Sequence, residues 1–508
     1  RLCWFMLSFV STDHPPLPLS ADVLDQLGPE ITTPRYARDQ LRPSIVHIGV
    51  GGFHRAHLAT YVDQLCRLGQ RDWSIVGAGV LPGDHTMARA LADQDHLYTL
   101  ITRGADTTSV EVIGSIVDYL HAVPSPQRLI DTIAAPTTEV VSLTVTEGGY
   151  PVDDTTGEFN GDPSAGGPMS AFDIIAAGLD QRRGNGGAPI TILSCDNVIG
   201  NGLVTRTATL GAAQHHDPGL AEWIEASATF PNSMVDRITP GTTDDDRSWL
   251  ATNYGLTDLW PVVTEPFRQW VVQDSFGGAR PPLEDLDVIV TTDVEPYELM
   301  KLRLLNAGHS CLAYLAALTE FDSVDGAMAE PHQRRFVNGF LDHEGKPALP
   351  AVAGVDLDAY TASVVERFSN PQIGDQIARL CLDGSAKFPK FLLPTIRTLL
   401  QVGGPIALGA LALAGWCEYL NGTTEQGTAI SPANDPALDL AIEHAQRSRN
   451  DPRAFLDFTE VFGSDLSGPG RFADAFVAAL TRLRTDGVRS SIDAALQEVE
   501  RSHDRSIG

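Results

Sequence analysis

The sequence predicts an α/β domain followed by a mainly α-helical domain. From about residue 44 to about residue 291, apolar runs typical of buried strands alternate with amphipathic, helix-like segments. Beyond that point strand patterns nearly stop and long helical patterns follow. Such alternation indicates a mostly parallel sheet covered by helices on both faces. We therefore predict an α/β domain over residues 22–290 and a helical domain over residues 291–508, preceded by a frayed or artefactual leader over residues 1–21.

The α/β domain opens with a strand, a turn and a helix. Residues 44–50 predict a buried strand, residues 51–55 a turn, and residues 56–68 an amphipathic helix. A second strand at residues 73–80 precedes a helix that begins near Asp84. The segment 153–167, rich in Gly, Asp and Pro, predicts a surface loop. Further strands are predicted at residues 97–102, 110–116, 139–146, 190–194, 261–264 and 287–292, with helices between several of them.

The helical domain begins with a long helix. After Pro296, which suits a first helical turn, strong helix formers run on to Leu318 with only Gly308 against the pattern. Further helices are predicted at residues 324–340, 360–368, 371–381, 405–420 and 471–484.

Composition excludes several classes of partner. The net charge of −29 argues against a nucleic acid or an anionic membrane surface as a partner. Six scattered cysteines form no close pair, which favours a reducing cytoplasm and no Cys-rich zinc site. The apolar first ten residues are followed by no small-residue cleavage site, so a signal peptide is not favoured. No later apolar run is long enough to span a bilayer.

A glycine-rich turn follows the first strand of the α/β domain. Small residues at Gly49, Gly51 and Gly52 allow the backbone to approach a pyrophosphate, and the next helix supplies N–H donors. His54 stands where Gly-x-Gly-x-x-Gly has its third glycine, so the segment could also be only a tight turn. We predict a Rossmann-like cofactor site built from Ile48, Gly49, Val50, Gly51, Gly52, Phe53, His54 and Arg55.

Two other features bear on the cofactor. Asp84 follows the second strand, where a carboxylate can accept both ribose hydroxyls and repel a 2′-phosphate, which favours NAD over NADP. Asp84 could equally be a cap for the next helix. His54 and His57 have a spacing that could chelate a metal, but no third ligand lies nearby. We therefore predict no metal, because a lysine can take the proton of an alcohol instead.

The long helix carries three polar residues on one side. At ~100° per residue, Lys301, Asn306 and His309 fall within an arc of roughly 140°. Burial would disfavour the charged form of Lys301 and let it act as a general base, while the other two could donate to a developing alkoxide. They could also be a solvated edge or hydrogen-bonded core residues. Tyr297 and Lys301 together resemble the Tyr-x-x-x-Lys pair of short-chain dehydrogenases.

Three more segments are unusually polar. Residues 194–197 (Ser-Cys-Asp-Asn) end a strand, residues 230–240 place charges within an apolar run, and residues 383–391 follow the helix bearing Arg379. Each could also be a turn, a buried ion pair or a loop with solvated lysines.

Together these stretches resemble the long-chain polyol (mannitol) dehydrogenase family. The resemblance covers nearly the whole chain from about residue 22. It argues against Tyr297 as the acid/base of a short-chain dehydrogenase, because proteins of that class are much shorter and lack the second domain. The matching stretches are residues 45–57 (Ile-Val-His-Ile-Gly-Val-Gly-Gly-Phe-His-Arg-Ala-His), 146–150 (Thr-Glu-Gly-Gly-Tyr), 194–197, 230–240 (Phe-Pro-Asn-Ser-Met-Val-Asp-Arg-Ile-Thr-Pro), 301–309 and 383–390.

The resemblance implies metal-independent, NAD-linked oxidation of a small acyclic sugar alcohol and the reverse reduction of a ketose. By carry-over Lys301 is the base, Asn197 and Asn306 stabilise the alkoxide, and His309 orients the reacting end. The implied substrate contacts are Val235, Asp236, Arg379 and Lys387.

Some alternatives remain open at this stage. Relatives often carry an acidic pair after the second strand, whereas this chain has Gly83 and Asp84, so NADP use stays possible. Fructuronate reductase, an arabinitol or sorbitol dehydrogenase and an inactive sugar- or nucleotide-binding relative are the competing functions. We expect a monomer or a small homo-oligomer.

Overall fold

The computed structural model describes residues 15–507 apart from 124, 154–155, 163–168 and 433. The chain forms two compact units, Arg1–Val294 and Glu295–Gly508. The first fourteen residues of the predicted leader lie outside the described residues, while β1 (Leu17–Pro18) pairs with β12 (Leu256–Thr257). Much of the predicted loop 153–167 also lies outside them.

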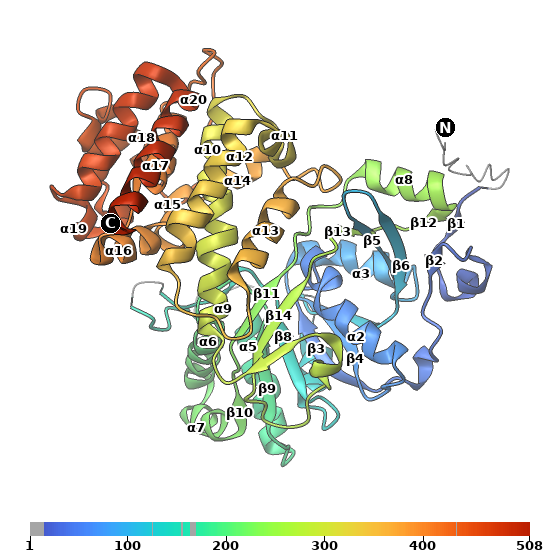
Figure 1. The fold of residues 1–508 in the computed structure, drawn as a ribbon. Helices are drawn as coiled ribbons and strands as arrows, with labels where there is room; N and C mark the ends of the chain where they lie inside the picture. Colours follow the sequence, from blue (N-terminus) through green and yellow to red (C-terminus); the bar gives the residue numbers. More distant parts are fainter. Residues whose placement is uncertain (1–14, 124, 154–155, 163–168, 433, 508) are drawn as a thin grey trace, which may run out of the picture. The chain divides into compact units, whose positions relative to one another are not determined.

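The first unit is built on a parallel six-stranded sheet (Figure 1). Every pair in it is parallel, which confirms the predicted fold class. Numbered along the chain, the strand order is 3-2-1-4-5-6, the order of dinucleotide-binding sheets. From one edge to the other, the strands are β7 (Ile116–His121), β4 (Ser74–Gly79), β3 (Pro43–Ile48), β8 (Val140–Leu143), β9 (Ile190–Ser194) and β10 (Ala228–Thr229).

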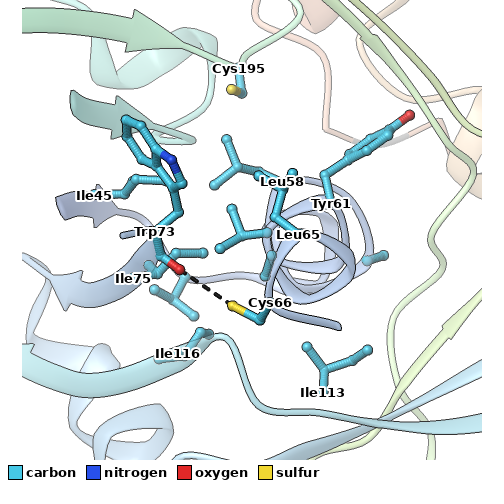
Figure 2. Packing of buried hydrophobic residues seen from close by; sticks show 14 of the residues in the cluster. Ile45, Leu58, Tyr61, Leu65, Cys66, Trp73, Ile75, Ile113, Ile116 and Cys195 are labelled. Carbon is cyan, nitrogen blue, oxygen red and sulfur yellow. Dashed lines mark hydrogen bonds between the residues drawn. The ribbon is translucent and has the colours of Figure 1, made fainter. Parts of the chain in front are cut away.

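Alternation along the central strands buries both faces of the sheet. Ile45 and Ile75 belong to one core cluster with residues of α2 (Leu58–Arg67), whereas Val46 and Val76 belong to a cluster on the opposite face. Figure 2 shows Ile45 and Ile75 of the sheet together with Leu58 and Leu65 of α2 in this cluster. The opposite face is covered by α4 (Gln127–Ala134), α5 (Ala171–Gly184), α6 (Asn201–His216) and α7 (Pro218–Ser227). Period-two patterning therefore positions the sheet between two layers of helices.

Besides the β1–β12 pair, the described residues of the first unit form two smaller sheets, and part of them was not predicted. The predicted strand at residues 110–116 covers most of one strand but only the first residue of β7, and β11 and β14 were missed. β11 contains Asp236 and β14 begins and ends with Gln, so neither gives a long apolar run. The strand orders are β13 (Val262–Thr264), β5 (Tyr98–Arg103), β6 (Thr108–Ile113), β2 (Ile31–Thr32) and β11 (Ser233–Asp236), β14 (Gln269–Gln273), β15 (Ile289–Thr291).

The turn predicted at residues 51–55 is already helical. α1 spans Gly52–Ala56 and ends at His57, whose φ of −118° and ψ of −93° separate it from α2. The glycines did not break the helix because they lie at its start, where the first N–H groups have no partner within the helix. The other helices of this unit are α3 (His85–Ala92) and α8 (Asp244–Tyr254).

The second unit contains helices in place of strands, as the sequence predicts. The helix predicted at residues 324–340 is two helices, because Pro331 lacks an N–H and Glu330 caps the second one. Only residues 377–380 of the helix predicted at 371–381 are helical; Gly374, with φ +62°, precedes them. Residues 471–484 begin a longer helix that bends at Gly487.

The helices of the second unit are α9 (Glu295–Met300), α10 (Ala307–Leu318), α11 (Val324–Ala329), α12 (Pro331–Phe340), α13 (Leu357–Phe368), α14 (Ile377–Leu380), α15 (Gly384–Phe391), α16 (Leu393–Val402), α17 (Ala407–Leu420), α18 (Leu438–Arg447), α19 (Thr459–Ser467) and α20 (Arg471–Ile507). α17 is buried on nearly all sides and packs against α10 and α20. Among the helices of the described residues, none combines the length and apolar character needed to cross a bilayer.

Candidate active site

The glycine loop lies where the sheet reverses its strand order. β3 leads into Gly49, whose φ is +97° and whose hypothetical Cβ would lie 2.0 Å from the carbonyl oxygen of Thr144, just after β8. Only glycine is tolerated there. At Gly51 the nearest atom to such a Cβ would be 4.0 Å away. The loop therefore combines a forced turn with an open backbone at the switch point between β3 and β8, which suits a pyrophosphate.

Several side chains of the predicted cofactor loop point into the core. Ile48, His54 and Arg55 are all at most 1 % exposed. Arg55 donates to the carbonyl oxygens of Gly51 (3.3 Å) and Trp260, which ties the loop to the rest of the unit. These three side chains therefore support the loop from within the core, and only their backbone groups remain as candidates for cofactor contacts.

The histidines of this region are neutral core residues. His54 stacks on His47 with ring centroids 3.4 Å apart, and His57 Nε2 donates to the carbonyl oxygen of Gln269 at 3.0 Å. Burial lowers the pKa of His47 and of His57 to about 3. The rings of His54 and His57 thus face different neighbours, which does not favour the metal-binding alternative. Within the described residues, no three His, Cys, Asp or Glu side chains gather to hold a metal ion.

Asp84 serves as a cap and retains a free oxygen. Its Oδ2 accepts from the Leu81 N–H at 2.9 Å, within the turn of residues 82–84 that precedes α3. Among the described residues Oδ1 accepts no hydrogen bond. Burial, with the nearby Asp84 carboxylate, raises the pKa of Tyr119 on the neighbouring strand β7. The Asp84 carboxylate therefore closes the turn before α3 and makes no side-chain cap bond to α3 itself, and one of its oxygens is left for a ribose hydroxyl.

Asp196 connects two of the stretches that resemble the family, residues 146–150 and 194–197. Its carboxylate accepts from the N–H groups of Val145 and Thr146, both at 2.9 Å, and from the hydroxyl of Tyr150 at 2.8 Å. These bonds join the loop after β8 to the end of β9. The following residue, Asn197, is exposed at this edge of the sheet. Asp196 and Tyr150 therefore fix the backbone that presents Asn197.

Asn201 is a structural residue of this edge that the sequence analysis did not identify. Its Nδ2 donates to the Ser233 carbonyl oxygen at 2.8 Å, and its Oδ1 accepts from the Ser233 N–H at 2.9 Å. This pair of bonds anchors β11, on which Val235 and Asp236 are both buried. A lone Asn after a Gly carries no distinctive sequence signal, so only the structure assigns it.

The helix with the predicted catalytic residues is not α-helical throughout. Residues 301–306 form a π-helical segment between α9 and α10, and the Ala307 N–H bonds to the Leu302 carbonyl oxygen five residues back. Residues five apart in such a segment share a side, as residues four apart do in an α-helix. Lys301 and Asn306 are five apart, so the π-helix brings them closer together than the predicted arc of roughly 140°.

Lys301 and the residues around it on the helix are largely buried. Lys301 is 7 % exposed and Glu298 is 8 % exposed. The hydroxyl of Tyr297 donates to the Ala353 carbonyl oxygen at 2.8 Å, so it is engaged in a structural bond. The Tyr-x-x-x-Lys pair is thus not arranged as an acid/base pair. Further along, His309 stacks on Phe368 of α13 with ring centroids 3.9 Å apart.

A second π-helical segment, residues 341–345, supports the first. Gly345 packs so closely on the Lys301 helix that a Cβ there would lie 2.8 Å from Leu304 Cδ2. The preceding residue, Glu344, is fully buried and accepts from the N–H groups of Leu408 (2.7 Å) and Gly409 (2.8 Å) at the start of α17. Burial raises the pKa of Glu344 to about 8.

Two further predicted substrate contacts, Arg379 and Lys387, lie on consecutive helices of the second unit. Arg379 of α14 pairs with Asp375 through Nε and Nη2. Lys387 of α15 donates to the Leu380 carbonyl oxygen at 3.3 Å. The second unit thus carries Lys301, Asn306, His309, Arg379 and Lys387, whereas the first carries the glycine loop, Asp84, Asn197, Val235 and Asp236.

Two family models match most of the chain. Residues 43–285 match the mannitol dehydrogenase Rossmann domain, and residues 293–484 match the mannitol dehydrogenase C-terminal domain. Mannitol 2-dehydrogenase of Aspergillus fumigatus strain Af293 is 41% identical over 496 residues, covering 94% of this chain and 99% of that protein. Mannitol 2-dehydrogenase of Cereibacter sphaeroides is 43% identical, covering 91% of this chain and 98% of that protein.

Solved structures give the same picture. The Pseudomonas fluorescens mannitol 2-dehydrogenase ternary complex with NAD and D-mannitol matches with a TM-score of 0.85 and 42% identity, covering 95% of this chain and 100% of that one. A D-sorbitol dehydrogenase in substrate-free form matches with a TM-score of 0.86 and 34% identity, covering 93% and 100%. With both domains matched in order and relatives aligned over nearly their full length, this chain belongs to the mannitol dehydrogenase family.

Proposed function

We propose that this protein is an NAD-dependent polyol dehydrogenase that interconverts D-mannitol and D-fructose without a metal ion. The observation that carries the proposal is the enclosure of Lys301 on a π-helical segment that turns Asn306 to the same side. Similarity to a mannitol 2-dehydrogenase solved with NAD and D-mannitol supports the choice of cofactor and substrate.

Each proposed role follows from the chemistry of the side chain. Bound NAD would supply the hydride acceptor. Enclosure disfavours the ammonium form of Lys301, so its neutral amine accepts the proton of the reacting hydroxyl. The side-chain amides of Asn197 and Asn306 donate to the oxygen as negative charge develops on it. His309, held by its stacking on Phe368, orients the reacting end of the polyol.

Four residues would bind the part of the polyol beyond the reacting hydroxyl. A polyol offers only neutral hydroxyls, so a site that selects it needs several donors and acceptors. Asp236 supplies acceptors, Arg379 and Lys387 supply donors, and Val235 shapes the apolar wall. On the cofactor side, the glycine loop holds the pyrophosphate and the free oxygen of Asp84 accepts from the adenosine ribose.

Two alternatives are weighed against this proposal. Fructuronate reductase or an arabinitol or sorbitol dehydrogenase would use the same residues, but the D-sorbitol dehydrogenase structure is 34% identical and the mannitol 2-dehydrogenase structure 42%. An inactive relative would be expected to have lost part of the set Lys301, Asn197, Asn306 and His309, and this chain has all four.

A substrate panel tests the proposed function. NADH oxidation would be measured with D-fructose and D-fructuronate, and NAD reduction with D-mannitol, D-sorbitol and D-arabinitol. Both assays would be repeated with the phosphorylated cofactor and with a chelator present. We expect the highest kcat/KM for D-fructose among the ketoses and for D-mannitol among the polyols, and no loss of rate with the chelator. A higher kcat/KM for D-fructuronate would replace the proposed substrate, and inhibition by the chelator would contradict a metal-free mechanism.

A further inference from the structure

A single ion pair fixes the orientation of Arg379. Its Nε and Nη2 donate to the two carboxylate oxygens of Asp375 at 2.8 and 2.5 Å. A guanidinium group has five N–H donors in a rigid plane. Side-on pairing uses two of them and leaves the far edge, with both Nη1 hydrogens and one on Nη2. That edge can bind two oxygen atoms at once, either of a vicinal diol or of a carboxylate.

The acid of this pair is the fixed partner. The Asp375 side chain is 7% exposed, whereas that of Arg379 is 55% exposed. The Asp375 carbonyl oxygen accepts from the Val324 N–H at 2.9 Å, and the Ile377 N–H donates to the Asp322 carbonyl oxygen at 2.9 Å. These bonds flank an isolated bridge between residues 323 and 376. The backbone thus holds Asp375 on both sides, and its carboxylate in turn orients the more exposed guanidinium group of Arg379.

The pair also determines what charge a ligand meets. A lone arginine attracts a carboxylate more strongly than a neutral hydroxyl, because both partners are then charged. The carboxylate of Asp375 compensates the charge of Arg379 and would repel an anionic ligand at short range. Hydrogen bonds from the free edge to neutral hydroxyls are retained.

We propose that Asp375 is a positioning residue that orients Arg379 and makes it select neutral polyols and ketoses over sugar acids. The inference rests on the proposed function, in which Arg379 contacts the substrate. Asp375 would then be a specificity determinant of that site. Its charge gives a physical reason why the enzyme would prefer a neutral ketose to a sugar acid that carries a carboxylate.

The test compares a neutral and an acidic ketose in two variants. Asp375→Asn removes the charge while keeping one acceptor, and we expect the ratio of kcat/KM for D-fructuronate to that for D-fructose to rise about tenfold. Asp375→Glu keeps the charge but displaces the guanidinium, so we expect KM for D-fructose to rise several-fold, kcat to stay near native and the ratio to stay unchanged.

Arg397 and Asp465 provide a control with the same pairing geometry but a more exposed acid, since the Asp465 side chain is 55% exposed. They form the same side-on pair, at 2.7 and 3.0 Å, elsewhere in the second unit. Asp465→Asn should leave both KM values and the ratio at their native values. A general structural effect would instead alter Asp465→Asn and Asp375→Asn alike, without a change in the ratio, and would overturn the inference.

A further variant separates failure of this inference from failure of the proposed function. If Arg379→Ala impairs both substrates while Asp375→Asn leaves the ratio native, the inference is wrong and the substrate role of Arg379 stands. If Arg379→Ala changes neither substrate, that role is itself wrong. Should Asp375→Asn fail to fold, Asp375→Glu decides: a native KM for D-fructose contradicts the positioning role, and a raised KM at native kcat supports it.

Discussion

At the scale of the residue, Asp84 has one observed role, in the turn before α3, and one proposed role, in binding the cofactor. One carboxylate oxygen accepts from the Leu81 N–H at 2.9 Å and so shapes the turn before α3. The other is available to a ribose hydroxyl. Because the same side chain shapes the turn and carries the charge, a substitution to alanine alone would confuse the two effects. Asparagine separates them, since it keeps an acceptor for Leu81 and loses only the negative charge.

We therefore expect Asp84→Asn to raise the ratio of kcat/KM with NADP to kcat/KM with NAD by about tenfold, because repulsion of the 2′-phosphate is lost. Its thermal stability should remain near native. Asp84→Ala should change the ratio similarly and also lower Tm, since the N–H of Leu81 loses its partner. If both variants kept the native ratio of kcat/KM with NADP to kcat/KM with NAD, Asp84 would have only a structural role in the turn. Steady-state kinetics with both cofactors and thermal unfolding measure the two effects.

At the scale of the element, the glycine loop separates folding from binding. Gly49 has φ +97° and faces the Thr144 carbonyl oxygen, so Gly49→Ala should lower the free energy of unfolding by about 3 kcal/mol or more. Gly51 has ordinary backbone angles and open space, so Gly51→Ala should fold normally. Its added methyl group should nevertheless weaken NADH binding, because it occupies the approach of the pyrophosphate.

Urea unfolding and NADH titration of the two loop variants provide the comparison. Near-native unfolding of Gly49→Ala would contradict the steric argument. Native NADH affinity in a folded Gly51→Ala would show that this loop does not hold the pyrophosphate.

Elements also differ in how well the sequence predicts them. The strands around Ile45, Ile75 and Ile192 were predicted to within about two residues, because a strand buried on both faces is a continuous apolar run. β11 was missed because it is a short strand that ends in a charged residue, Asp236. The π-helical segment was missed because the same helix formers favour α and π turns, and tertiary contacts such as Gly345 on Leu304 are long-range.

The candidate site shows the same division. The candidate residues of the Lys301 helix could be proposed from residue type and spacing, whereas the residues that support other parts of the candidate site could not. Asp196, Asn201 and Asp375 bond to backbone groups or to another side chain. Asp196 lies in a segment that the sequence marked as polar, but its bonding partners were not predictable, and nothing in the sequence around Asn201 and Asp375 distinguishes them from turn residues. Burial of His54 and Arg55 was likewise not predictable, because the sequence only showed that they follow a glycine loop.

At the scale of the whole molecule, both units contain buried ionisable groups, and those of one unit change stability with pH in the opposite direction to those of the other. In the first unit burial lowers the pKa of His47 and His57 to about 3. Their contribution to stability is present above the ordinary histidine pKa of about 6.5 and is lost as pH falls towards 3. In the second unit burial raises the pKa of Glu344 to about 8. Its contribution is complete below about pH 4.5 and is lost as pH rises through 8.

Glu344→Gln tests the alkaline side of this account. Glutamine cannot ionise, so between pH 5 and 9 the native protein should lose a few kcal/mol of unfolding free energy relative to the variant. Urea unfolding of both proteins, followed by helical circular dichroism at several pH values, gives the difference. Because glutamine mismatches one of the two N–H donors from α17, the variant should be less stable at pH 5. A stability difference that does not depend on pH would contradict ionisation of Glu344 in this range.

The central claim is that the enclosed amine of Lys301 takes the hydroxyl proton of the polyol. Single-turnover oxidation of D-mannitol by Lys301→Ala, with NADH affinity measured in parallel, tests it most directly. Lys346→Ala, which removes an ion-paired lysine of the same unit, is the control. We predict that hydride transfer in Lys301→Ala slows by about 10³-fold or more while the NADH Kd stays near native, because a general base acts in the transition state. A rate within about tenfold of native, with NADH bound normally, would contradict the account.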